Sequence, residues 1–160
     1  KNNFQNVDWV IAGVRNLPLS SYEPAKKAGI RVIYESTYDI LQNARAAVVT
    51  SGTATLETAL FNVPQVVVYK TSRISYTIGK RLIKVAFVAF VNLIVDREVV
   101  KELIQDAYNP ASVNTELRSI LQDGPKREKV LEGYSELKKR LGNKKASQET
   151  ARLIYENISA

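Results

Sequence analysis

The sequence holds 160 residues, 45% of them apolar and 24% charged, which is enough apolar material to bury the core of one soluble domain. Lysine and arginine number 23 against 16 aspartates and glutamates, so the formal net charge is +7. Cysteine and histidine are both absent, which excludes disulfides, thiol nucleophiles, histidine acid–base catalysis and most zinc sites.

Short apolar runs alternate with helical patterns through the first two-thirds of the chain. Apolar and β-branched runs predict strands over residues 8–13, 30–34, 46–50, 65–69 and 87–91. Helical patterns lie between them, over residues 20–28, 37–43, 54–61 and 75–84. Strands and helices that alternate at this spacing indicate βαβ units and a parallel sheet.

The strand signal ends near residue 96, and only helical patterns follow it. These cover residues 97–105, 110–121, 126–141 and 147–158. We therefore expect one domain of the α/β class over residues 1–160. A Rossmann-like parallel sheet with flanking helices is expected over about 1–95, and a helical C-terminal extension over about 96–160.

The sequence pattern predicts neither a membrane-spanning helix nor a signal peptide. No apolar run reaches the roughly 18 residues of a membrane-spanning helix, and the first residues lack a signal-peptide pattern. The chain begins with Lys1 and contains no methionine, so we expect it to be a piece of a longer protein.

A strand, a tight turn and a helix meet at residues 49–57. Gly52 lets the backbone approach a ligand closely, while Ser51 and Thr53 offer hydroxyl groups. The helix that begins at Ala54 presents free N–H groups and the positive end of its dipole, which together suit a phosphate or diphosphate. Glu57 lies one turn further along, where its carboxylate could accept hydrogen bonds from ribose. An ordinary capped strand–turn–helix is the alternative. No Gly-Lys-Ser/Thr follows, so this is not a P-loop.

Polar residues also follow the strand predicted at 87–91. Asn92 could contact a sugar hydroxyl or a base edge, and Arg97 and Glu98 begin the next predicted helix. The alternative is structural: Asp96 caps that helix, and Glu98 complements its dipole.

A basic cluster surrounds the helix predicted at 75–84. It comprises Lys70, Arg73, Lys80, Arg81 and Lys84. The functional interpretation is a surface for anionic lipid headgroups or for a phosphorylated lipid substrate, and the alternative is a solvated cationic face. Nucleic-acid binding is a further use of a basic chain, but no nucleic-acid-binding motif supports it.

Several segments together resemble the C-terminal half of the lipid-A-disaccharide synthase family. They are Thr-Ser-Gly-Thr-Ala-Thr-Leu-Glu at 50–57, Pro-Gln-Val-Val-Val-Tyr at 64–69, Lys-Arg-Leu-Ile-Lys-Val at 80–85, Val-Asn-Leu-Ile at 91–94 and Arg-Glu-Val-Val-Lys-Glu-Leu at 97–103. The resemblance runs from about residue 7 to the end of the chain.

The resemblance implies a glycosyltransferase with two Rossmann-like domains, the GT-B fold, of which the C-terminal one binds the nucleotide-sugar donor. The family joins UDP-2,3-diacylglucosamine to 2,3-diacylglucosamine 1-phosphate, with release of UDP and inversion at the anomeric carbon. No metal and no cofactor are implied. A cytoplasmic enzyme, peripheral on the inner face of the cytoplasmic membrane, is expected, with a homodimer as a candidate assembly.

Carried over by position, the family's roles fall on residues of both polar segments. Ser51, Gly52, Thr53 and Ala54 would hold the UDP diphosphate, and Glu57 would bind the ribose. The donor cleft would also contain Asn92, Arg97 and Glu98, and Asn92 is the residue that we most expect to matter for turnover.

Two departures from the family pattern stand out. Ala-Phe-Val-Asn at 89–92 replaces a Ser-Leu-Pro-Asn-like segment, which removes a proline turn. This sequence lacks the family's N-terminal domain, which carries the acceptor site and the general base. It also lacks a first strand with a Leu-Pro-Gly-Ser-Arg-like pattern. In a sheet ordered 3-2-1-4-5-6 that strand is central. We expect that the strands at 8–13 and 46–50 either pair directly or flank a gap filled by another chain.

Two other functions compete with this interpretation. One is a different UDP-sugar enzyme of the same fold, although the histidine or glycine-rich signatures of such enzymes are absent. The other is a non-catalytic basic domain that binds anionic membrane or nucleic acid, for which salt-sensitive binding without a response to UDP would be diagnostic.

Overall fold

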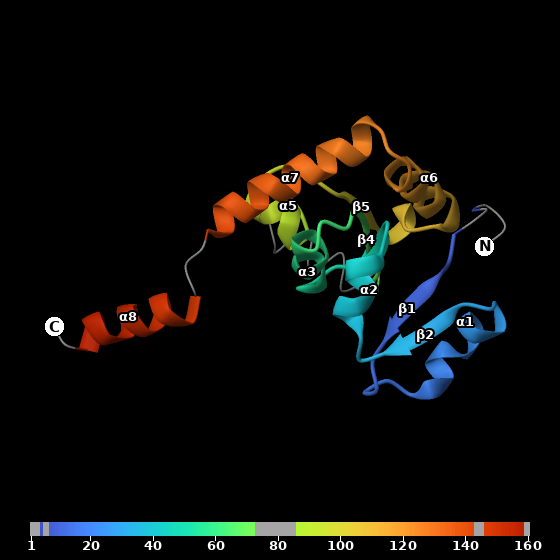
Figure 1. Ribbon diagram of the computed structural model, residues 1–160, viewed down its shortest axis with the longest axis horizontal. Helices are drawn as coiled ribbons and strands as arrows, with labels where there is room; N and C mark the ends of the chain where they lie inside the picture. Colours follow the sequence, from blue (N-terminus) through green and yellow to red (C-terminus); the bar gives the residue numbers. More distant parts are fainter. Residues whose placement is uncertain (1–3, 5–6, 73–85, 143–145, 159–160) are drawn as a thin grey trace.

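Two parallel sheets carry the fold of the computed structural model, which describes residues 4, 7–72, 86–142 and 146–158 (Figure 1). The first sheet pairs β1 (Val10–Gly13) with β2 (Arg31–Tyr34). The second contains β3 (Ala47–Thr50), β4 (Gln65–Tyr69) and β5 (Lys101–Ile104), in that order. Each pairing is parallel, so the predicted α/β class with a parallel sheet is confirmed.

The strands divide into two sheets at the place of the missing first strand, between β1 and β3. In the described residues β1 and β3 belong to different sheets, so the first of the two expected alternatives, direct pairing of these strands, is wrong for this structure. That another chain fills the space between them stays a prediction.

Helices connect the strands as the sequence patterns indicate. The chain forms α1 (Glu23–Lys27), α2 (Thr37–Asn43), α3 (Ala54–Leu60), α5 (Phe90–Val95), α6 (Pro110–Leu121), α7 (Pro125–Leu141) and α8 (Ala146–Ile158). Short 3-10 helices cover Leu19–Tyr22, before α1, and Gln105–Ala107, after β5. The helix predicted over 75–84, and the basic cluster around it except Lys70, lie outside the described residues.

The structure corrects two predicted elements, the strand at 87–91 and the helix at 97–105. A helix, α5, begins at Phe90, and the second of these segments contains strand β5. Val91, Asn92 and Val95 are the buried residues of α5, which is helical spacing despite the strand propensity of its side chains. Because β5 joins β4, the sheet continues past the boundary expected near residue 96.

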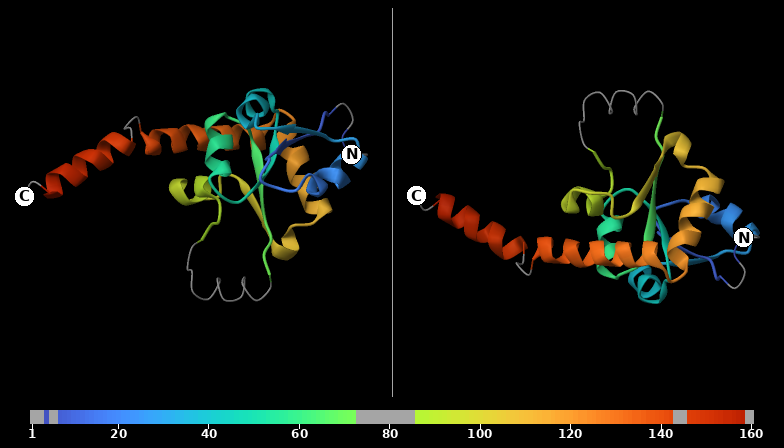
Figure 2. Two further views of the ribbon diagram at one scale, coloured as in Figure 1. Left: turned by 90° about the horizontal axis from the view of Figure 1, so that it is seen from below. Right: turned by 90° about the horizontal axis from the view of Figure 1, so that it is seen from above.

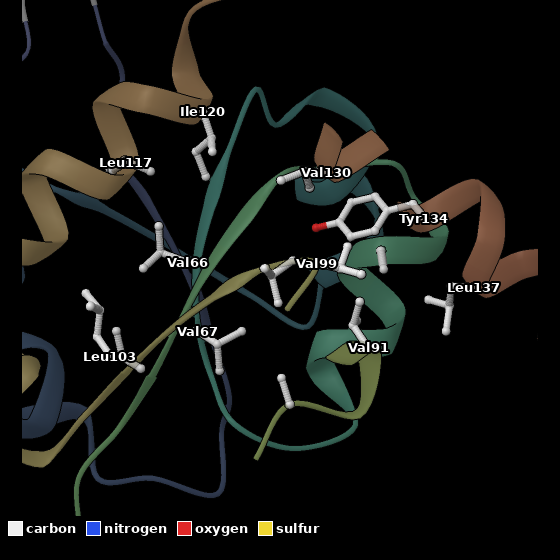
Figure 3. Packing of buried hydrophobic residues seen from close by; sticks show 14 of the residues in the cluster. Val66, Val67, Val91, Val99, Leu103, Leu117, Ile120, Val130, Tyr134 and Leu137 are labelled. Atoms are coloured by element: carbon white, nitrogen blue, oxygen red, sulfur yellow. The ribbon is translucent and has the colours of Figure 1, made fainter. Parts of the chain in front are cut away.

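Strand β4 is the centre of the core, since Gln65, Val66, Val67 and Val68 are all buried. Val66 and Val67 point to opposite faces because side chains alternate along a strand. Figure 3 shows Leu117 and Ile120 of α6 on the side of Val66. On the other side lie α3, α5 and α7, with Val91, Tyr134 and Leu137 among the residues that close that half of the core.

The last helix lies apart from the sheets. Figures 1 and 2 show α8 beyond the C-terminal end of α7, at the opposite end of the molecule from the N-terminus. Its Ile154, Tyr155 and Ile158 are exposed. Among the described helices, none combines the length and the apolar character needed to cross a membrane.

Candidate functional site

The candidate site begins where β3 ends. Thr50 closes the strand opposite Val68 of β4, and the Ser51 N–H donates to the Val68 carbonyl at 3.1 Å. Residues 51–54, which we call the 51–54 loop, then lead into α3. In open parallel α/β sheets, ligands bind beside the carboxyl ends of the strands. The loop therefore stands at the edge of the sheet where a ligand is expected.

The backbone of the 51–54 loop is open to a ligand. Gly52 has a φ of 147°, a conformation that favours glycine, and a Cβ built there would meet nothing within 4 Å. Thr53 and Ala54 are exposed. Among the hydrogen bonds of the described residues, none uses the N–H groups of Gly52, Thr53 or Ala54 as donors. Three successive unused N–H groups at the start of a helix are donors that an anion can accept.

The side chains around the loop differ in what they have left to offer. The Ser51 hydroxyl donates to the carbonyl of Val88 at 2.7 Å, so its proton is already committed within the protein. Glu57 is half-buried on the first turn of α3, and no hydrogen bond or ion pair of its carboxylate occurs among the described residues. The structure thus places residues 51–54 and Glu57 at the same edge of the sheet, and their contacts with UDP stay a prediction.

Asn92 is fully buried, and its amide is saturated. Its Oδ1 accepts from the N–H groups of Val99 at 2.8 Å and Val100 at 2.9 Å. Its Nδ2 donates to the Val100 carbonyl at 2.8 Å and to Glu102 Oε1 at 2.9 Å. An asparagine side chain has two donors and two acceptor sites, and all four are used here. The structure thus gives Asn92 a structural role in the turn before β5, and direct contact with a sugar stays a prediction that this arrangement does not favour.

Glu102 is the residue that the sequence reasoning missed. It lies on β5 opposite Val67 and is half-buried. Its carboxylate accepts from the N–H of Val88 at 2.9 Å, the N–H of Ala89 at 2.9 Å and Asn92 Nδ2 at 2.9 Å. The only available signal was an acidic residue inside the apolar stretch 99–104, which the sequence reasoning assigned to a helix.

Arg97 and Glu98 are not brought together with the 51–54 loop. Both precede Lys101, which begins β5 and pairs with Val66 near the amino end of β4. Arg97 forms an ion pair with Glu136 of α7 at 2.9 Å, and Glu98 pairs with Lys101 at 3.2 Å. Because the strand after them is β5, both residues lie at the amino edge of the sheet, opposite the loop. Their place in the donor cleft stays a prediction that this arrangement does not favour.

Asp96, predicted to cap a helix that begins after it, has a different role in the structure. Asp96 ends α5 in a left-handed conformation, with a φ of 58°, instead of beginning a helix. Aspartate tolerates this region better than most residues because its short polar side chain bonds locally. Asp96 thus reverses the chain so that Val99 and Val100 reach the amide of Asn92.

Tyr134 takes part in buried hydrogen bonds that join α7 to the segment around β4. Its hydroxyl donates to the Val63 carbonyl at 3.0 Å and accepts from Gln65 Nε2 at 3.2 Å. Burial raises the pKa of Tyr134 well above its usual value, so the phenol stays neutral. Gln65 Nε2 also donates to the Thr55 carbonyl at 2.9 Å, which fixes α3 on β4. In the part of the chain that the structure describes, no three acidic side chains gather where a metal ion could bind.

Comparison with known proteins identifies relatives of this chain. A family model described as lipid-A-disaccharide synthetase matches residues 21–155. The lipid-A-disaccharide synthase of Syntrophus aciditrophicus (strain SB) is 43% identical over 127 residues, which are 79% of this chain and 33% of the relative. That of Myxococcus xanthus (strain DK1622) is 41% identical over 118 residues, 74% of this chain and 31% of the relative. That of Persephonella marina (strain DSM 14350 / EX-H1) is 35% identical over 146 residues, 91% of this chain and 37% of the relative. The chain thus spans about a third of the length of these relatives.

Proposed function

The chain belongs to the lipid-A-disaccharide synthetase family, and we propose that it forms the donor-binding part of an inverting glycosyltransferase that makes the lipid A disaccharide. The donor in this proposal is UDP-2,3-diacylglucosamine, and the acceptor is 2,3-diacylglucosamine 1-phosphate. The observation that carries the proposal is the 51–54 loop, with its three unused N–H groups at the carboxyl edge of the sheet.

The proposed reaction is a single displacement at the anomeric carbon of the donor. The 6-hydroxyl oxygen of the acceptor forms the new bond to this carbon, while the bond from the carbon to the diphosphate oxygen breaks. The hydroxyl proton goes to a general base, which the family resemblance assigns to the N-terminal domain, and Glu57 beside the loop is assigned to the ribose. UDP leaves with the electron pair, so negative charge grows on the diphosphate as the reaction proceeds.

The 51–54 loop would stabilise this growing charge. The N–H groups of Gly52, Thr53 and Ala54 have no acceptor among the described residues, so they are available to donate to the diphosphate oxygens. The open space at Gly52 would let a phosphate oxygen approach the backbone. Glu57 would accept hydrogen bonds from the ribose hydroxyls, which it can do because the described residues leave its carboxylate unoccupied.

The proposed location of the enzyme follows from the proposed substrates. Both carry acyl chains, so we propose that the enzyme acts peripherally at the inner face of the cytoplasmic membrane. A homodimer stays a prediction. Membership of the family disfavours the two competing functions, another UDP-sugar enzyme and a basic domain that binds membrane or nucleic acid.

Calorimetric titration with UDP tests the proposal directly. The full-length protein should bind UDP saturably, and Glu57→Ala should weaken binding by roughly tenfold or more, the usual effect of losing a hydrogen bond to a charged group. Glu132→Ala is the matched control, because Glu132 is an exposed glutamate on α7. A folded full-length protein that ignores UDP would overturn the proposal.

A further inference from the structure

Val88 and Ala89 lie between the 51–54 loop and strand β5 and bond to both. The backbone of Val88 is held on both sides: its carbonyl accepts from the Ser51 hydroxyl at 2.7 Å, and its N–H donates to Glu102 at 2.9 Å. The N–H of Ala89 donates to the same carboxylate at 2.9 Å. Hydrogen bonds of the Val88 backbone therefore connect Glu102 to Ser51.

Both ends of this connection rest on the buried strand β4. The Ser51 N–H donates to the Val68 carbonyl, and Glu102 lies opposite Val67 in the parallel ladder. The contacts form a closed ring from β4 to β5, through Glu102 and Val88 to Ser51, and back to β4. Val67 is 0% exposed, so the ring is anchored on a part of the core that moves little.

The chemistry of the ring requires a carboxylate at position 102. Val88, Ala89 and Asn92 all donate to it, and among the described residues no cation is paired with it. A glutamine would keep one acceptor oxygen and place an amide NH₂ where an N–H now points, so two donors would face each other. Three hydrogen bonds from N–H groups satisfy the charge without an ion pair.

We propose that Glu102 is a positioning residue for donor binding: it fixes the Val88 peptide, which holds Ser51 so that the N–H groups of the 51–54 loop stay set for the donor diphosphate. This inference rests on the proposed function of that loop. It assigns Glu102 no contact with the substrate. The inference also includes Asn92, whose Nδ2 donates to the Glu102 carboxylate and helps to hold it in place.

The test compares donor and acceptor binding in the full-length protein. We expect Glu102→Gln to raise the dissociation constant for UDP, and the KM for the UDP-sugar, about tenfold, with the acceptor KM unchanged. Glu132→Gln is the control, since it makes the same chemical change on the exposed face of α7. An unchanged UDP affinity in folded Glu102→Gln, or an equal rise in both KM values, would overturn the inference.

A double-mutant cycle with Ser51→Ala separates positioning from a general loss of stability. Because Glu102 acts through Ser51, the double variant should bind UDP about as weakly as the weaker single variant, whereas independent effects would multiply. If Glu102→Gln does not fold, Ser51→Ala carries the test alone, and a normal UDP affinity in that variant overturns the inference. A wild-type protein that does not bind UDP fails the proposed function first, and the inference with it.

Discussion

The Ser51 hydroxyl donates to the Val88 carbonyl at 2.7 Å, although 37 positions separate the two residues in the chain. This bond joins the turn after β3 to the segment that leads into α5. The hydroxyl that the sequence pattern assigns to a ligand is thus already used to hold the loop that would bind it. Ser51 is expected to act on the ligand through the shape of the loop.

Replacing Ser51 by alanine should therefore weaken the loop without disturbing the core. We expect Ser51→Ala to lower UDP affinity by about 3- to 10-fold and the free energy of unfolding by about 1 kcal/mol, the usual net value of one hydrogen bond. Calorimetry and urea denaturation measure the two effects. Ser135→Ala is the control, because the Ser135 hydroxyl also donates to a backbone carbonyl, that of Leu131 on α7. Equal UDP affinities in the two variants would contradict this account.

Gly52 tests whether the backbone shape of the loop matters. Alanine at this position must adopt a φ of 147°, which we expect to cost about 1–2 kcal/mol of unfolding free energy and to weaken UDP binding strongly. Gly124 offers a matched control, since its φ is 157°, it precedes a helix as well, and an added Cβ also meets nothing within 4 Å. Gly124→Ala should lose similar stability and keep UDP affinity; a parallel loss of affinity would argue against a specific role for the loop.

Tyr134 allows a prediction about stability alone. Tyr134→Phe removes a buried hydroxyl that donates to Val63 and accepts from Gln65, so both partners lose a hydrogen bond inside the core. The expected loss is about 1–3 kcal/mol of unfolding free energy in urea, with the slope of the transition unchanged. Tyr108→Phe changes an exposed tyrosine and should have almost no effect. A loss below about 0.5 kcal/mol for Tyr134→Phe would refute the assigned contacts.

The lowered pKa of Glu136 makes the free energy of unfolding depend on pH. Hydrogen bonds from Arg97, and secondly from Arg140, hold the pKa of Glu136 below its usual value. A carboxylate whose pKa is lower in the folded state stabilises the protein above its unfolded pKa of about 4.3. That contribution is lost as the pH falls through the folded-state pKa.

Urea denaturation of the wild type and Glu136→Gln at pH 7 and pH 3 tests this sign. The stability difference should be larger at pH 7 and should shrink with added salt, because these side chains are partly exposed to solvent. Glu132→Gln, four residues earlier on α7, provides the comparison. A difference that grows toward pH 3 would show that the ion pairs do not form in solution.

The sequence allowed most of the secondary structure to be predicted, and the exceptions have a physical cause. The patterns at 37–43 and 65–69 matched α2 and β4, because local propensity and burial agree there. They disagree at 90–95, where β-branched residues form α5, and at 101–104, where Lys101 and Glu102 lie in a strand. In both places long-range contacts decide: α5 packs on α3 and α7, and Glu102 serves three N–H donors.

The candidate site was predicted only as far as local spacing reaches. Residues 51–54 and Glu57 are adjacent in the chain, so their common position follows from a strand that runs into a helix. The partner of Ser51 is 37 residues away, and Glu102 lies 14 residues after Val88, so no local pattern indicates either contact. Arg97 and Glu98 lie at the amino edge of the sheet because the segment after them is strand β5, where the local pattern predicts a helix.

The separation of β1 and β2 from the other strands implies two levels of resistance to local opening. The β1–β2 ladder has four residues in each strand and little buried side-chain area, and a two-stranded sheet is marginal by itself. Strand β4, in contrast, is paired on both sides and buried at Val66, Val67 and Val68. In deuterated solvent, the amides of Val10–Gly13 should exchange within minutes, while those of Val66 to Val68 should exchange only when the whole second sheet unfolds.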